Sequence, residues 1–299
     1  MSSKNHMRIQ RNEISSIKVF TLILLFGICI SNVGECYSQS RSPIPEKLVV
    51  LTFDDGCISD VEFVMPLLSE YGFGATFFFT DAFLRDESLK DENYMTWNDA
   101  LKIHKAGFEI GNHTKNHRGV KGLSASELQK ELEYIENRCE EYGIEKPKTF
   151  CYPAFGFDLN AVQVLREKGY LFARRGVFPE YPYNREGARG PVYEPEEDDP
   201  LLIPCTGFSG PDWGFEDFLW ALEQGGNGKI PVLCFHGVPD LDHPWVNTDT
   251  EVFKKYMDHL RDNNYQVIAM RDLSKYVDPA RYPADSDAPI QRRINRLKN

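Results

Sequence analysis

The sequence predicts an α/β fold in which parallel strands alternate with helices. Two observations predict it: β-rich and helix-like segments alternate along most of the 299-residue chain, and polar side chains follow four of the expected strands where each strand ends. A repeated strand-then-helix order requires parallel strands joined by crossover helices, so the fold is a (β/α) barrel or an open doubly wound sheet. We count seven or eight strand–helix units, which favours a barrel.

Local patterns justify the elements in order. Gly72 ends the first helix-like stretch and Gly107 the second, while Ser124 with Glu127 forms a capping-box pattern at the start of the third. The expected helices are Ser59–Tyr71, Thr96–Ala106, Ser124 to about Gly143, Leu159–Lys168, Phe215–Gln224 and Thr250–Asn263. The expected strands are Lys47–Phe53, Ala75–Thr80, Phe108–Asn112, Lys148–Pro153, Tyr170–Arg174, Ile230–His236 and Tyr265–Met270, with Leu201–Pro204 the least regular candidate.

The N-terminus differs from the rest of the chain. Four basic residues between positions 4 and 18 precede the apolar run Val19–Ile30. This run is short for a membrane span and matches the apolar core of a signal peptide. We therefore expect residues 1–38 to be a signal peptide, with export to the periplasm, the cell surface or the medium and no stable membrane insertion after cleavage. An uncleaved anchor helix is the alternative.

Composition limits the rest. A formal charge of -11 argues against a nucleic-acid partner, and the cysteines show no CxxC spacing, which excludes a zinc ribbon. We expect one catalytic domain over residues 39–277, in which the irregular, acidic stretch Gly176–Asp212 forms a functional lid or rim. Residues 278–299 are polar and end basic, so we expect a solvated, partly disordered C-terminal tail.

Chemistry-bearing side chains follow four separate strands. In parallel α/β barrels the carboxyl ends of the strands are where catalytic residues gather. The four clusters are Asp54 with Asp55, His113 with His117, Tyr152 with Phe155, and His236. Two histidines four residues apart and one carboxylate form a three-ligand set with open positions, as a catalytic zinc ion requires. The alternatives are a surface or capping role for the histidines and a helix cap for the aspartates.

These motifs resemble the polysaccharide deacetylase family, carbohydrate esterase family 4. The family's TFDDG motif is present as Thr52–Gly56, and its H-[S/T]-x-x-H motif as His113–His117. The resemblance spans about Lys47 to Leu273 and implies a distorted (β/α) barrel of about seven parallel strands. It further implies that the protein is a metal-dependent hydrolase acting on carbon–nitrogen bonds other than peptide bonds.

The same resemblance assigns roles to the site residues. It implies that Asp54 is the general base, that Asp55, His113 and His117 hold one divalent metal ion, with zinc favoured, and that His236 is the general acid.

Two departures from the family pattern concern the base. The third motif usually begins with an arginine that orients the base, and Cys151 stands at that position here. The fourth motif is also absent, and Phe172–Gly176 stands in its place. Our hypothesis is that Arg174, with Arg175 as the less favoured candidate, reaches Asp54 and replaces the missing guanidinium.

The substrate expected from the resemblance is an N-acetylated extracellular glycan: peptidoglycan, a chitin-like oligomer or an exopolysaccharide. Aromatic rings could bind it by stacking on sugar rings, and the candidates are Tyr152, Phe155, Trp213 and Trp245. The alternatives are an acetyl-ester or small amide or imide hydrolase on the same fold, and a non-catalytic glycan-binding relative. A retained Asp54 argues against the last, because a binding protein needs no base. Nothing in the sequence indicates an oligomeric state.

Overall fold

The computed structural model describes residues 41–86, 88, 93–182 and 187–298. The predicted signal peptide lies outside these residues. Among the residues so described, no helix is long and apolar enough to cross a membrane.

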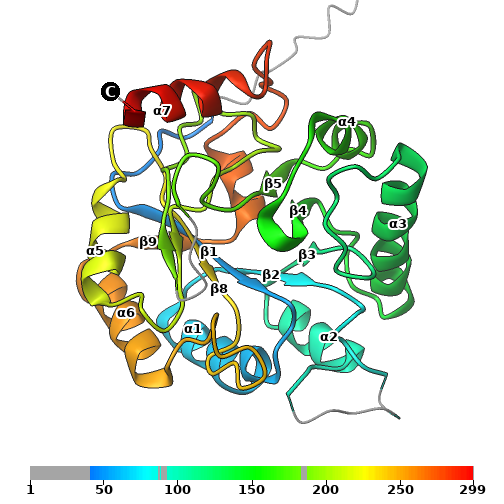
Figure 1. Cartoon of the computed structure of the whole chain (residues 1–299). Helices are drawn as coiled ribbons and strands as arrows, with labels where there is room; N and C mark the ends of the chain where they lie inside the picture. The colour runs from blue at the N-terminus through cyan, green and yellow to red at the C-terminus, as the bar shows by residue number, and fades with distance from the viewer. Residues whose placement is uncertain (1–40, 87, 89–92, 183–186, 299) are drawn as a thin grey trace, which may run out of the picture. The chain divides into compact units, whose positions relative to one another are not determined.

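A mostly parallel sheet curls into a half-barrel, as predicted (Figure 1). Its order is β5-β4-β3-β2-β1-β8-β7-β6, with β9 also paired to β1, and every pair is parallel except β6–β7. The strands are β1 Leu48–Asp54, β2 Thr76–Phe79, β3 Glu109–Asn112, β4 Thr149–Cys151, β5 Phe172–Arg174, β6 Ala188–Arg189, β7 Gly207–Phe208, β8 Val232–Phe235 and β9 Gln266–Ile268. The irregular candidate Leu201–Pro204 is not a strand of its own, because it contributes only an isolated bridge between Ile203 and Arg174.

Helices lie around the outside of the curled sheet (Figure 1). They are α1 Met65–Tyr71, α2 Trp97–Lys105, α3 Ala125–Glu141, α4 Leu159–Glu167, α5 Phe215–Glu223, α6 Thr250–Asp262 and α7 Ala288–Lys298, with short helical turns η1 Asp60–Val64, η3 Pro153–Phe155 and η4 Met270–Lys275. The predicted capping box is present, since the Glu127 N–H donates to the Ser124 hydroxyl and the Ser124 N–H donates to the Glu127 carboxylate.

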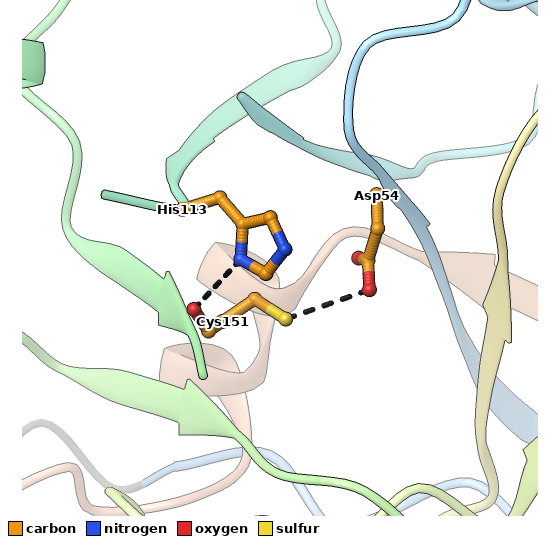
Figure 2. Close-up of side chains that lie close together, drawn as sticks. All are labelled: Asp54, His113 and Cys151. Carbon is orange, nitrogen blue, oxygen red and sulfur yellow. Dashed lines mark hydrogen bonds between the residues drawn. The ribbon is translucent and has the colours of Figure 1, made fainter. Parts of the chain in front are cut away.

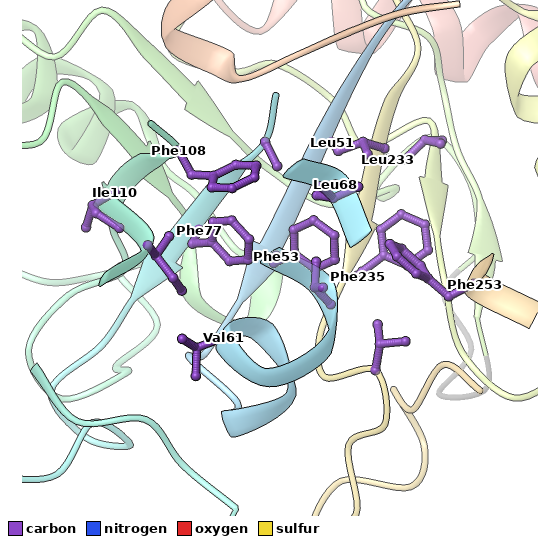
Figure 3. Close-up of a cluster of buried hydrophobic side chains, with 14 of the residues drawn as sticks. Leu51, Phe53, Val61, Leu68, Phe77, Phe108, Ile110, Leu233, Phe235 and Phe253 are labelled. Atoms are coloured by element: carbon purple, nitrogen blue, oxygen red, sulfur yellow. The ribbon is translucent and has the colours of Figure 1, made fainter. Parts of the chain in front are cut away.

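Alternate residues of β1 point into two different apolar layers, because successive side chains of a strand face opposite sides. Val49, Leu51 and Phe53 join the layer between sheet and helices, where Phe53 stacks on Phe77 and Phe235 (Figure 3). Leu48 and Val50 face the barrel interior with residues of the other strands. By the same alternation, Asp54 at the end of β1 belongs to the interior row.

The expectation of a solvated, partly disordered C-terminal tail is wrong. Residues 288–298 form α7, whose Ile290 is buried against the apolar cluster between α3, α4 and β5. Arg292 and Arg293 of this tail pair with Glu197 and Asp198, a connection that the sequence pattern alone does not predict.

We expect Ile290→Ala to lower the free energy of unfolding by about 2 to 4 kcal/mol, because it removes buried methyl groups and leaves a cavity. Leu297 lies on the same helix but is 56% exposed. Leu297→Ala should therefore change the free energy of unfolding by less than about 0.5 kcal/mol. Urea unfolding of both variants measures the difference. Equal effects would show that α7 does not pack against the domain as described.

Candidate functional site

The two adjacent aspartates reach one site because the backbone turns between them. Asp54 is the last residue of β1, points into the barrel interior and is 1% exposed. Asp55 follows with a left-handed backbone, φ +76°, so the usual strand alternation no longer applies to it. Its carboxylate therefore lies beside the histidines that follow β3.

Arg174 is the partner of the buried Asp54. Its Nη2 lies 2.6 Å from Asp54 Oδ1 and 2.5 Å from Oδ2, so the predicted contact is present. Burial by itself would raise the pKa of Asp54, but the nearby charge of Arg174, then of His113 and His236, outweighs it and lowers that pKa. The carboxylate is therefore ionised at neutral pH. Arg175, the less favoured candidate, pairs with Glu180 instead.

Strand register places Arg174 over the position where the family pattern has arginine. Cys151 on β4 pairs directly with Arg174 on β5, and Arg174 Nη2 lies 2.7 Å from the Cys151 sulfur. The guanidinium also lies over the rings of Phe78 and Phe155, at 5.7 and 5.5 Å from their centroids. A Cβ on Gly176 would lie 2.4 Å from Phe155 Cβ, so glycine there allows Phe155 to approach.

His113, His117 and Asp55 form a compact set of possible metal ligands. The Nε2 atoms of His113 and His117 lie 3.4 and 3.3 Å from Asp55 Oδ1. His113 Nδ1 donates to the Cys151 carbonyl at 2.8 Å (Figure 2), and this contact leaves Nε2 facing Asp55. His117 has a left-handed backbone, φ +50°, which brings its ring to the same side of the loop as His113.

The donor set fits a divalent cation. Asp55 Oδ1 is buried and accepts no hydrogen bond from the residues that the structure describes, although two imidazole nitrogens face it. Burial lowers the pKa of His117 to about 4, so the ring is neutral at pH 7, as a metal ligand must be.

In a second set, Asp54, His113 and Cys151, the ligand atoms also lie within 4.8 Å of one another, but this set suits a metal less well. Asp54 is occupied by Arg174, and burial raises the pKa of the Cys151 thiol despite the charge of Arg174, so the sulfur stays protonated. Figure 2 shows its sulfur directed to Asp54 instead.

His236 follows β8 and faces the same site. Its Nε2 lies 3.8 Å from Asp55 Oδ2, and its ring packs edge-on against Phe208. Its Nδ1 is buried and has no hydrogen-bond partner among the described residues. Nothing in the described chain therefore orients this imidazole through Nδ1.

A cleft of about 420 Å³ is lined by the polar residues Asp54, Asp55, His113, His117 and His236. Its remaining walls are largely aromatic. Two of the four aromatic residues that the sequence suggested for sugar stacking are there: Phe155, and Trp245, which is 45% exposed. The expectation is wrong for Tyr152 and Trp213. Tyr152 is fully buried with its hydroxyl bonded to the Leu201 carbonyl, and Trp213 is 4% exposed with its ring against Gly207.

Several cleft residues escaped the sequence analysis. They are Phe83, Phe178, Phe208, His243 and Val246. His243 and Val246 flank Trp245 in the loop after β8, so the loop itself was a usable signal. Phe83 and Phe178 come from irregular segments with no motif that marks them.

We expect His113→Ala and His117→Ala each to weaken zinc binding by more than the roughly 10- to 100-fold typical of losing an outer-shell partner, because each removes a ligand. His243→Ala is the matched control, because His243 lines the same cleft but bonds to Asp240. Metal content after dialysis against a zinc buffer measures the effect. Full zinc occupancy in both ligand variants would rule out this site.

Comparison with known proteins agrees with the motifs. A family model described as polysaccharide deacetylase matches residues 41–173, a segment that holds Asp54, Asp55, His113 and His117 but not Arg174 or His236. The Bacillus subtilis protein named "Putative polysaccharide deacetylase YxkH" is 24% identical over 133 residues, which are 44% of this chain and 46% of that protein. The chain thus matches less than half the length of such curated relatives.

Solved structures share the fold. The chitin deacetylase of the fungus Colletotrichum lindemuthianum is 18% identical, with a TM-score of 0.53 over 81% of this chain and 94% of that one. PdaA of Bacillus subtilis, a family 4 carbohydrate esterase, is 17% identical, with a TM-score of 0.51 over 77% of this chain and 81% of that one. Residues 41–173 therefore match the polysaccharide deacetylase family model, in agreement with the motifs at Thr52–Gly56 and His113–His117, and the described chain shares the fold of these deacetylase structures.

Proposed function

We propose that this protein is a metal-dependent hydrolase that removes acetyl groups from an N-acetylated extracellular glycan. The observation that carries the proposal is the pairing of two carboxylates with different partners. Asp54 is held by Arg174, while Asp55 faces His113 and His117. One carboxylate is thus available as a base and the other as a metal ligand.

Each polar group has a distinct part in the proposed reaction. A divalent cation held by Asp55, His113 and His117, with zinc favoured, would polarise the acetyl carbonyl and acidify a water molecule. Asp54 takes the proton from the attacking water, because Arg174 keeps it ionised. His236, facing the same cleft, gives a proton to the departing amine nitrogen, and acetate leaves.

The chain also offers a backbone donor for the negative charge that develops on the carbonyl oxygen. The turn after β4 holds Ala154 and Phe155 in left-handed conformations. The Phe155 N–H already donates to the Tyr152 carbonyl, so the Ala154 N–H, beside the cleft, is the better candidate. In other enzymes one such donor is worth about 3 kcal/mol of barrier.

The substrate class rests on the cleft and on the relatives. The half-exposed ring of Trp245 can stack on a sugar face. No lysine or arginine is among the described residues that line the cleft, so the cleft suits a neutral sugar better than an anionic one. The similar structures include a chitin deacetylase. A signal peptide over residues 1–38 would place the catalytic domain, residues 39–277, where such polymers occur. An acetyl ester on a sugar remains the second candidate, because Cys151 and the absent fourth motif depart from the family pattern.

We expect Asp54→Asn to lower the rate of acetate release roughly 100- to 10,000-fold, because the amide cannot accept the proton of water. The zinc content should stay at the wild-type level, since the proposed ligands are intact. Acetate release from N-acetylated and O-acetylated glycan panels, with and without a chelator, measures both.

The same panel separates the alternatives. Release from O-acetylated glycans alone would select the ester hydrolase. Loss of acetate release by Asp54→Asn together with loss of zinc would place Asp54 among the ligands and contradict its assignment as base.

We expect Arg174→Ala to move the acidic limb of the kcat/KM profile to higher pH. Arg174 opposes the effect of burial on Asp54, so its removal lets burial raise the pKa of that carboxyl. Less of the base is then ionised at a given acidic pH, and activity falls there first. Steady-state kinetics across pH test this, and an unshifted acidic limb would show that Arg174 does not set the pKa of the base.

A further inference from the structure

We propose that α7 positions one wall of the active-site cleft, and that Arg293 is the residue through which it acts. The inference rests on the proposed function only for its kinetic consequence. It joins two features that the site does not use: the acidic Glu194–Asp199 run and the basic end of the chain.

Arg293 makes buried contacts on both sides. Its Nε lies 3.0 Å from Glu180 Oε1, and its Nη2 lies 2.6 Å from Asp198 Oδ1. All three residues are less than a tenth exposed. Buried, hydrogen-bonded ion pairs of this kind hold their partners in one geometry, whereas exposed pairs contribute little.

Glu180 passes this constraint to Arg175. Arg175 Nη2 lies 2.6 Å from Glu180 Oε1, and Arg175 Nη1 lies 2.9 Å from Glu180 Oε2. This is a bidentate ion pair, and both side chains are fully buried. Arg175 Nη1 also donates to the Phe178 carbonyl at 3.0 Å. The segment from 175 to 180 is therefore closed on itself and tied to α7.

This segment reaches the active site at two points. Phe178 lines the cleft, and Arg175 directly follows Arg174, which holds Asp54. A displacement of the segment would move the cleft wall and the residue that orients the base. Small misplacements of positioning groups can reduce rates by up to about 100-fold.

The other charges of the tail supply a matched control. Arg292, one residue away on α7, pairs with Glu197 at 3.0 Å, but both side chains are more than 40% exposed. An exposed pair contributes little to stability, and no contact of Arg292 with Glu180 or Arg175 is present among the described residues. Arg292→Ala therefore removes the same charge from the same helix without breaking the buried connection.

The test compares Arg293→Ala, Arg293→Lys and Arg292→Ala in the mature chain loaded with zinc. We expect Arg293→Ala to lower kcat/KM roughly 10- to 100-fold with unchanged zinc content. It should also speed amide hydrogen exchange in residues 175–180. Arg293→Lys should recover part of both effects, because lysine keeps the charge but not the fork. Arg292→Ala should match the wild type in both.

The comparison of these variants can contradict the inference in the following ways. Kinetics and exchange in Arg293→Ala equal to those of Arg292→Ala would overturn the inference. If Arg293→Ala does not fold, Asp198→Asn loosens the same connection without changing side-chain size and replaces it. If the wild type releases no acetate from any glycan, the proposed function fails, and hydrogen exchange alone then decides whether α7 holds this segment.

Discussion

The buried ion pair between Arg174 and Asp54 is the interaction on which the rest of the site depends. Neither group could be buried alone, and removing one partner from such a pair typically costs about 3 to 5 kcal/mol. Together they place an ionised carboxylate at the end of the barrel interior, where apolar side chains and the Cys151 and Cys234 thiols surround it. Asp54 is paired with the guanidinium of Arg174, whereas Asp55 faces the imidazoles of His113 and His117. Two adjacent residues thereby acquire different chemistry.

Cys151 connects the two halves of this arrangement. Its small side chain leaves room for Arg174, which arrives from the neighbouring strand at the same register. Its carbonyl accepts the Nδ1 proton of His113 and so orients the histidine toward Asp55. Cysteine thus stands where the family pattern has arginine, and a guanidinium from the neighbouring strand bonds to Asp54.

Long-range charge pairing organises the rim of the barrel. The acidic run after β5 meets the basic C-terminal helix, and the buried members of that meeting lie next to the strand that carries Arg174. A tail of ordinary polar composition is thus tied by ion pairs to the segment that follows Arg174. Its one buried isoleucine, Ile290, adds apolar contact to the charge pairing.

The sequence by itself determined the α/β class, the order of the main strands and helices, and the residues at the ends of β1, β3 and β8, because hydrophobic period, caps and short motifs are local signals. Only the tertiary structure decided which of these residues meet, and in what protonation state. Tyr152 lies at the end of an expected strand and Trp213 in an expected loop, where an aromatic ring could face solvent, yet tertiary packing buries both rings. In α7, Arg292 and Arg293 pair with acidic residues 95 positions away, and Ile290 packs into an apolar cluster, contacts that no local pattern in the tail indicates. The reach of Arg174 to Asp54 depends on strand register across β4 and β5, and register is a property of the assembled sheet, set by packing on both of its faces.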